Sequence, residues 1–252
     1  MQFVAVSNSG INRVIISYNG STWLSQSTPP NSWNSICWSP YLQLYVAVAS
    51  SGSNRVMTSS DGITWTARNA ASNLNWTSVC WASELLLFVA VASSGTGNRI
   101  MTSSDGITWT SRTSPADNNW NSIIYVSDLR LLIAIASTGD NRLMYSDNGI
   151  NWKLVTLPVN NTWIGITWSS DLNNLMIISS DGTNRLLRSE YFKPTNYNSL
   201  VSNRFKFNNN LGISSKKLLV LINFSPDLIP LIFGISFLSI EKISLNLSSL
   251  LT

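Results

Sequence analysis

The sequence predicts an all-β protein, a β-propeller of about five recognisable four-stranded blades. One phrase recurs five times in residues 1–188: an aliphatic run, a Ser/Gly turn, the pair Asn-Arg and a second short run. The five arginines of this phrase lie 42, 44, 43 and 43 residues apart, and a tryptophan follows each of the first four at the same period. Repeats of this length, made of short strands, are typical of propellers, in which each repeat forms one blade.

Each full unit is expected to contain four short strands joined by turns. The units lie near residues 1–30, 31–73, 74–117, 118–160 and 161–188. In the second unit the strands are expected at residues 35–39, 44–49, 55–59 and 63–68. Asp61-Gly62, just before the last of these, is typical of a hairpin turn that needs positive φ. Runs such as YVAVAS are apolar on both faces, as in strands buried between neighbouring sheets.

The first unit begins at its second strand, residues 3–6, and the last 64 residues, 189–252, depart from the repeat in composition. A strand from this tail could complete the first blade, and the tail could also be a degenerate blade. Residues 218–240 form an almost continuously apolar segment that is as long as a membrane span. Pro226, Asp227 and Pro230 interrupt this segment. Membrane contact is therefore expected only through residues 218–240. If these residues do not enter a membrane, three alternatives remain: degenerate blade strands, a poorly folded tail, or a tail acquired by a shift of reading frame.

The charge balance argues against a nucleic-acid partner. Through Leu187 there are nine Lys/Arg and nine Asp/Glu, so the net charge of +4 arises entirely after that residue. A neutral repeat region carries no basic stripe of the kind that binds phosphate backbones. The first residues lack a charged segment followed by a long apolar one, so no signal peptide is expected and a cytoplasmic or particle-associated location is favoured.

The chain has no histidine and two cysteines, Cys37 and Cys80. This composition excludes His-dependent catalytic triads and most metal sites, so neither a metal nor a cofactor is expected. The two cysteines occupy the same place in successive units. They are expected to be buried free thiols or, alternatively, a bridge between neighbouring blades.

The turn SSDGITW occurs twice, at residues 59–65 and 103–109, with the variants SYNGSTW at 17–23 and SDNGINW at 146–152. It resembles the Asp-box, or BNR repeat, of sialidase-like propellers, and is similar to repeats of photosystem II assembly-factor propellers and of uncharacterised bacterial and viral propellers. The family pattern is Ser-x-Asp-x-Gly-x-Thr-Trp; Asp61 and Asp105 stand one place later, and only Asp147 keeps the family spacing.

In that family the box is a structural turn on the face away from the active site. The physical chemistry agrees, because Asp or Asn caps such a turn, Gly adopts positive φ and Trp packs between sheets. The residues to which we assign this structural role are Asp61, Gly62, Trp65, Asp105, Gly106, Trp109, Asp147, Gly149 and Trp152.

A candidate ligand-binding face follows from the strand order. In an antiparallel blade the Asn-Arg phrase lies at the end opposite the Asp-box turns, beside the segments that lead into the next blade. The residues expected there are Arg13, Arg55, Arg99, Arg142 and Arg185, with Asn54, Asn98 and Asn141, and with Trp76, Trp120 and Trp163. Arginine, amide and aromatic side chains suit sugars or carboxylates. The alternative is that each arginine clamps the neighbouring blade by stacking on a tryptophan or bonding loop carbonyls.

These observations favour a non-catalytic propeller that serves as a binding or protein-interaction platform, with a protein or glycan as its ligand. A sialidase-like glycoside hydrolase is one alternative, and it would depend on Asp117 and Asp140, the carboxylates expected on the arginine-bearing face. A structural component of a particle or assembly is a second alternative. The oligomeric state is not predicted.

Overall fold

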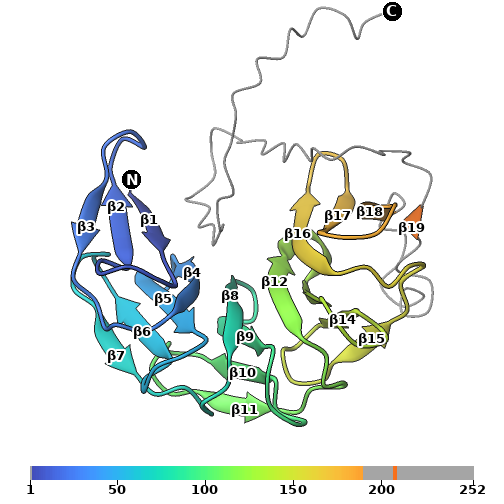
Figure 1. Ribbon diagram of the computed structural model, residues 1–252, viewed down its shortest axis with the longest axis horizontal. Helices are drawn as coiled ribbons and strands as arrows, with labels where there is room; N and C mark the ends of the chain where they lie inside the picture. Colours follow the sequence, from blue (N-terminus) through green and yellow to red (C-terminus); the bar gives the residue numbers. More distant parts are fainter. Residues whose placement is uncertain (1, 190–206, 209–252) are drawn as a thin grey trace, which may run out of the picture.

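The computed structural model describes residues 2–189 and 207–208, which form five antiparallel β-sheets arranged in an arc around a common centre (Figure 1). The prediction of an all-β propeller is confirmed. Within the described residues the only helical element is a short 3-10 turn, η1 (Ser127–Leu129). The strands are β1 (Phe3–Val6), β2 (Val14–Ser17), β3 (Leu24–Gln26), β4 (Trp33–Ser39), β5 (Leu44–Ala49), β6 (Val56–Ser59), β7 (Thr66–Arg68), β8 (Trp76–Ala82), β9 (Leu87–Ala92), β10 (Ile100–Ser103), β11 (Thr110–Arg112), β12 (Trp120–Val126), β13 (Leu131–Ala136), β14 (Leu143–Ser146), β15 (Lys153–Val155), β16 (Trp163–Ser169), β17 (Asn174–Ser179), β18 (Leu186–Ser189) and β19 (Phe207–Asn208).

Each sheet follows the chain from the centre to the rim. The four-stranded sheets run β4 to β7, β8 to β11, β12 to β15 and β16 to β19, with the first strand of each nearest the centre in Figure 1. The first sheet has three strands, β1 to β3, as predicted for a unit that begins at its second strand. The last strand, β19, pairs with β18 and comes from the segment that the sequence assigned to the tail.

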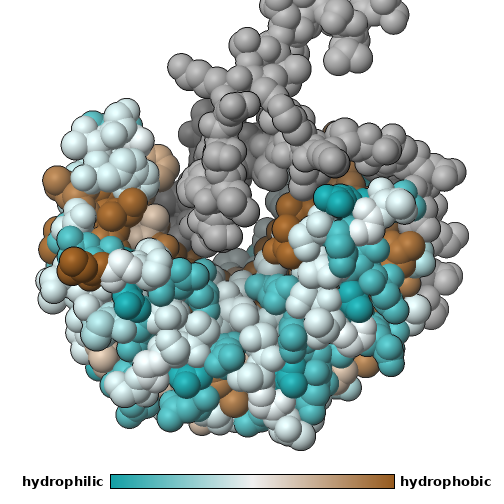
Figure 2. All heavy atoms as spheres, in the orientation of Figure 1, coloured by the Kyte–Doolittle hydropathy of each residue, from teal (hydrophilic) through white to brown (hydrophobic). Residues whose placement is uncertain are grey.

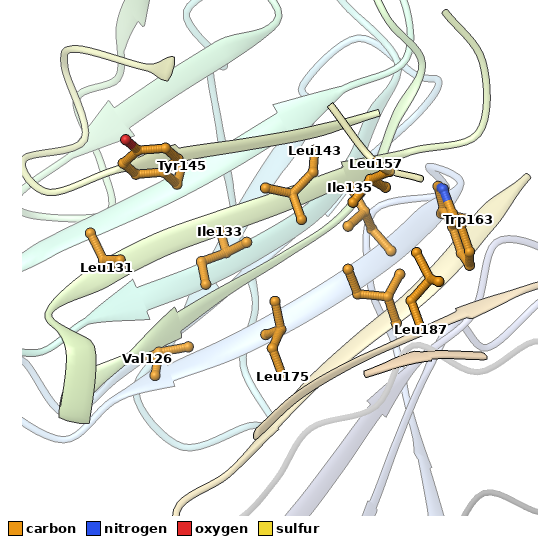
Figure 3. Packing of buried hydrophobic residues seen from close by; sticks show 11 residues of the cluster. Val126, Leu131, Ile133, Ile135, Leu143, Tyr145, Leu157, Trp163, Leu175 and Leu187 are labelled. Carbon is orange, nitrogen blue, oxygen red and sulfur yellow. The ribbon is translucent and has the colours of Figure 1, made fainter. Parts of the chain in front are cut away.

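The core lies between neighbouring sheets. In the central blades the third strands and β13 are buried along their whole length, and β5 and β9 are buried except at their first residues, as the apolar runs predicted. Figure 3 shows the cluster between the last two blades, where Ile133 and Ile135 of β13 lie opposite Leu175 of β17 and Leu187 of β18. Similar clusters fill the other three junctions. Burial of both sheet faces is therefore what joins the repeats.

A β-bulge near the start of each first strand adds hydrogen bonds between blades. The bulged residues Asn34, Thr77 and Asn121 donate their side-chain hydrogens to the carbonyl oxygens of the tryptophans that begin the next blades, at 2.9, 2.6 and 3.1 Å. In the last blade Ile164 occupies this position and is 47% exposed. The polar link therefore joins three of the described junctions.

The two cysteines lie in the first strands of adjacent blades, Cys37 in β4 and Cys80 in β8, and both are free thiols. The expected alternative of a bridge between blades is not formed. Burial raises the pKa of both thiols, so both are protonated at neutral pH. Cys37 packs as a small apolar residue between the second and third blades, and Cys80 does so between the third and fourth.

The surface that Figure 2 shows is mostly teal to white, with brown residues gathered on the two arms of the arc. Only 11% of the residues are charged, so Ser, Asn and Thr cover much of it. No helix among the described residues is long and apolar enough to cross a membrane. The predicted span at residues 218–240 lies outside the described residues, as does nearly all of the tail.

Candidate functional site

The two ends of the blades differ in charge. The arginine face consists of the loops 7–13, 50–55, 93–99, 137–142 and 180–185 and the connections 27–32, 69–75, 113–119 and 156–162. It carries five arginines against Asp117, Asp140 and Asp181. The turn face consists of the turns 18–23, 60–65, 104–109 and 147–152 together with 40–43, 83–86, 127–130 and 170–173. It carries six carboxylates against Arg130, so the two ends have opposite net charge.

All five predicted arginines lie on the arginine face, each at the end of its loop. In every case Nε donates a hydrogen bond to a glycine carbonyl of the same loop, at 3.0 Å for Arg13, 3.3 Å for Arg55, 2.8 Å for Arg99, 2.8 Å for Arg142 and 3.0 Å for Arg185. The loop thus fixes the direction of each guanidinium.

The arginines differ in what their outer nitrogens contact. Arg99 is 12% exposed, and its Nη1 donates to the carbonyl oxygens of Ser93 and Asn118 and to Oδ1 of Asn119. Arg55 reaches Oδ1 of Asn75 in the next connection at 3.3 Å. In contrast, the Nη atoms of Arg13, Arg142 and Arg185 make no hydrogen bond within the described part of the chain. Arg99 therefore acts as the clamp that the sequence left as an alternative. The Nη donors of the last three arginines stay without hydrogen bonds among the described residues, although Arg142 lies close enough to Asp181 for its positive charge to add to the hydrogen bonds from Thr162 that lower the pKa of that carboxyl.

Two of the predicted asparagines bond to the connections of the same face. Nδ2 of Asn54 donates to Oδ1 of Asn69 at 2.6 Å, and Oδ1 of Asn141 accepts a 2.7 Å hydrogen bond from the Thr156 hydroxyl. Oδ1 of Asn98 is buried without a partner. These side chains order the arginine face, and Asn98 has the one amide oxygen among them left without a bond.

A second set of asparagines, missed in the sequence, ties neighbouring segments of the arginine face together. Nδ2 of Asn31, Asn118 and Asn161 donates to the backbone oxygens of Asn54, Asn141 and Asn184. Each of these three residues stands two places before the tryptophan that begins a blade. The sequence does contain the repeated spacing Asn-x-Trp, but this spacing does not reveal which carbonyl oxygen accepts a hydrogen bond from the asparagine amide.

The tryptophans require a correction. Trp76, Trp120 and Trp163 were expected to offer aromatic surfaces beside the arginines, but all three are fully buried. Nε1 of Trp76 and of Trp120 donates to the carbonyl four residues earlier, at 3.0 and 3.2 Å, which folds the connection over the ring. These rings pack between blades and have no face for a ligand to stack on.

The two carboxylates considered for catalysis differ in their surroundings. Oδ1 of Asp117 accepts a 2.7 Å hydrogen bond from the backbone N–H of Gly97 and lies 3.6 Å from Nε of Arg99. Asp140 is exposed and has no hydrogen bond or ion pair among the described residues. Asp117 is thus held as part of the loop structure, which does not suit an acid or nucleophile that must approach a substrate.

On the turn face the Asp-box-like turns share one hydrogen-bond pattern. Oδ1 of Asp61 accepts hydrogen bonds from the backbone N–H groups of Ile63 and Thr64, at 2.8 and 2.7 Å, and Oγ of Ser59 accepts one from Gly62 at 2.8 Å. Gly62 has φ 73°. Nε1 of Trp65 closes the turn on the Gly62 carbonyl at 3.0 Å. Residues 103–109 repeat every one of these bonds.

The fourth blade corrects the assignment of Asp147. There Oδ1 of Asn148, next to Gly149, accepts the two backbone hydrogen bonds, at 2.9 and 2.8 Å. Asp147 occupies the place of Ser60 and Ser104 and takes no part in the turn. In the first blade Asn19 is the cap. The capping position therefore directly precedes the glycine in all four turns, and the family spacing at Asp147 is not used.

Replacing Asp61 by Asn is expected to preserve the fold and reduce its sensitivity to acid. Backbone hydrogen bonds from Thr64 and Ile63 lower the pKa of Asp61 in the folded protein. The ionised carboxylate therefore stabilises the fold fully above its pKa in the unfolded chain, which is about 4. This stabilisation is lost as the pH falls through the lower pKa of the folded protein. The melting temperatures of Asp61→Asn and of the wild type at pH 7 and pH 3 test this. The difference between the two pH values should be smaller in the variant, and an equal difference would contradict it.

Two other carboxylates of the turn face lie against the next blade. Oδ2 of Asp128 accepts a 2.7 Å hydrogen bond from Nε1 of Trp168 in the next blade. Glu84 holds the equivalent position one blade earlier and lies beside Tyr125. Burial first, and the Glu84 carboxylate second, raise the pKa of Tyr125, so its hydroxyl stays protonated. The role of these acids was not predicted because it depends on the packing of adjacent blades.

Among the residues that the structure describes, no group of three or more Cys, Asp or Glu side chains could hold a metal ion. Comparison by sequence gives no assignment. No known protein family matches the chain, and no curated protein matches it.

Solved structures similar to this chain are β-propellers. Virginiamycin B lyase from Staphylococcus aureus superposes with a TM-score of 0.61 at 14% identity, over 74% of this chain and 65% of the lyase, so the chain spans less than two thirds of that enzyme. A nidogen/laminin complex gives a TM-score of 0.56 at 13% identity, over 74% of this chain and 72% of the other. The propeller domain of Cps50 (Swd1) from Myceliophteria thermophila gives 0.54 at 10% identity, over 81% and 69%. At such low identity these similarities establish the fold, and the chain is a β-propeller built from repeated blades.

Proposed function

We propose that this propeller is a non-catalytic binding platform whose arginine face recognises carboxylate groups of a protein partner or, as a second ligand class, of an acidic glycan. The observation that carries the proposal is the orientation of Arg13, Arg142 and Arg185. A glycine carbonyl holds Nε of each side chain, while the Nη atoms remain without hydrogen-bond partners among the described residues. A guanidinium fixed in this way loses little conformational entropy when it forms paired hydrogen bonds to a carboxylate.

The carboxylates of the arginine face support a binding role over a catalytic one. Asp117 is bonded to Gly97 and lies beside Arg99, and Asp181 accepts hydrogen bonds from the backbone and hydroxyl of Thr162 at 2.6 and 2.5 Å. Among the described residues, Asp140 therefore has no second carboxyl group available to act with it. A glycosidase needs two carboxyl groups that both reach the sugar, so the hydrolase alternative has no supporting pair.

The similarity to other propellers is consistent with this proposal. The nidogen structure is a complex with laminin, so a propeller of related shape does engage a protein. The lyase shows that the same fold also carries an enzyme, which is why the proposal depends on the side chains of this chain and not on its fold. The resemblance of the turns to the Asp-box of sialidase-like propellers supports this proposal as well, because in that family the ligand lies on the face opposite those turns.

Binding to acidic probes should be lost when the free arginines are replaced. The double variant Arg142→Gln/Arg185→Gln removes two charged donors without disturbing a hydrogen bond to another blade, so it should weaken binding by about tenfold or more. The measurement uses two probes, a fluorescein-labelled oligoglutamate peptide followed by anisotropy and an array of uronic-acid and sialylated glycans. The two probes distinguish a protein from a glycan ligand.

Arg130→Gln provides the matched control. Arg130 is an exposed cation on the turn face with φ 50°, and Gln43 occupies the equivalent position of another blade with φ 49°. The control therefore removes one positive charge without straining the backbone, and it should leave binding unchanged. If the control lost as much affinity per charge removed as the double variant does, only net charge would matter, and the proposal would be overturned. Turnover of a fluorogenic sialoside by the wild-type chain would replace it with the hydrolase alternative.

A further inference from the structure

The turns of the second, third and fourth blades carry an exposed isoleucine at the same place. Ile63, Ile107 and Ile150 directly follow the turn glycines and are 43%, 47% and 49% exposed. The turn itself does not require them. In the first blade Ser21 holds this position, and its N–H makes the same hydrogen bond to the capping side chain, at 2.9 Å. The fold therefore gives no reason for an apolar side chain at three successive turn tips.

Large apolar side chains are also exposed in the turns that lie nearer the centre of the same face. Tyr41, Leu86 and Leu172 are 68%, 44% and 55% exposed. Leu86 adopts a left-handed backbone conformation, φ 50°, which is uncommon for leucine. On the arginine face, within the described residues, Ile11 is the one large hydrophobic side chain exposed to this degree. Apolar exposure is thus concentrated at one end of the blades, as is typical of interaction surfaces.

The same face is acidic. Its turns contain Asp61, Glu84, Asp105, Asp128, Asp147 and Asp171, and their one cation is Arg130. Part of this charge has no role in the fold, because Asn148 and not Asp147 caps its turn and because Asp171 has no hydrogen bond within the described residues. Exposed apolar side chains and carboxylates therefore occur in the same turns of this face.

We propose that the turn face is a second interaction surface, separate from the arginine face, that docks a cationic amphipathic segment of a partner protein. Charge complementarity identifies the occupant. Lysine or arginine side chains of the segment meet the carboxylates, which steer the encounter, and its apolar side chains cover the isoleucine tips. An anionic lipid surface is disfavoured because it would face six carboxylates.

The test uses the 252-residue chain and a fluorescein-labelled helical peptide of about 18 residues, made of lysine and leucine with the leucines on one face. Two comparison peptides replace lysine by glutamate or leucine by serine. Fluorescence anisotropy should show binding of the lysine/leucine peptide alone, and the affinity should fall as salt is raised above about 0.1 M. The variant Ile107→Ser/Ile150→Ser should weaken this binding by about tenfold, and Asp147→Ser should weaken it by a smaller factor.

Each variant copies a residue that the chain already uses at that position, Ser21 for the isoleucines and Ser60 or Ser104 for Asp147, so their melting temperatures should match that of the wild type. Ile11→Ser, on the opposite face and 96% exposed in the wild type, is the matched control and should bind normally. Equal affinity of all variants, or equal binding of the lysine/serine peptide, would overturn the proposal. So would light scattering that shows a wild-type dimer and a monomeric isoleucine variant, since the occupant would then be a second copy. Failure of the Arg142→Gln/Arg185→Gln experiment leaves these outcomes unaffected.

Discussion

Replacing Trp76 by alanine is expected to lower the free energy of unfolding by about 3 to 5 kcal/mol. The ring is completely buried between the second and third blades, where Val46, Val48 and Phe88 belong to the same cluster. Its Nε1 donates to the carbonyl oxygen of Ser72 and so holds the connection that leads into the blade. The substitution leaves a cavity that neighbouring β-strands cannot close, and it removes a partly buried hydrogen bond as well.

Chemical denaturation of Trp76→Ala and of Trp23→Ala measures this effect. Trp23 is 42% exposed at a turn of the first blade, so its loss should cost much less. The turn tryptophans Trp65 and Trp109, which the sequence placed between sheets, fall between these cases, because Trp109 is 8% exposed and Trp65 is half-buried. A transition for Trp76→Ala that coincides with the wild type would mean that the junction between blades is not packed as described.

The fold could be predicted because the sequence repeats the same pattern of apolar strands and polar turns in each unit. The apolar run and the Asn-Arg pair recur five times at a fixed period, and the Asp-Gly or Asn-Gly turn before a tryptophan recurs four times, so the pattern is unlike chance. Strand positions in the second unit agree with β4 to β7 within two or three residues. The pairing of β19 with β18 could not be predicted, because residues 207–208 lie outside the repeat pattern.

The candidate site was harder to predict because contacts between blades determine which of its side chains are bonded within the protein and which can reach a ligand. The sequence placed the five arginines on one face, but it could not say that Arg99 contacts Asn118 and Asn119 while Arg142 keeps free donors. It also took the tryptophans beside them as surface residues. A tryptophan that begins a strand can face a ligand or the next blade, and local spacing does not distinguish the two. The acidic turn face was overlooked because its carboxylates come from two different sets of turns.

Gly139→Ala is expected to destabilise the fold through the hydrogen bond that Asn118 makes to the backbone oxygen of Asn141, 2.9 Å long. Gly139 has φ 94°, which costs an L-residue about 1 to 2 kcal/mol by itself. A Cβ at this position would also overlap the side-chain amide of Asn118, which is buried, so the amide would have to move and its hydrogen bond would break. Loss of a buried hydrogen bond adds about 1 to 3 kcal/mol, giving a total of about 2 to 5 kcal/mol.

Gly10→Ala separates the two contributions to this prediction. Gly10 has nearly the same backbone conformation, φ 92°, but nothing lies within 4 Å of the added Cβ. This variant should therefore show the backbone strain alone, and the difference between the two free energies of unfolding reports the loss of the Asn118 contact. Asn118→Ala removes the same contact directly, so combining it with Gly139→Ala should cost less than the sum of the two single changes. Equal losses of stability in Gly139→Ala and Gly10→Ala would contradict this prediction. The Asn118 amide would then not stabilise its loop, and the loop that bonds to the Arg142 guanidinium would not be held in a fixed position.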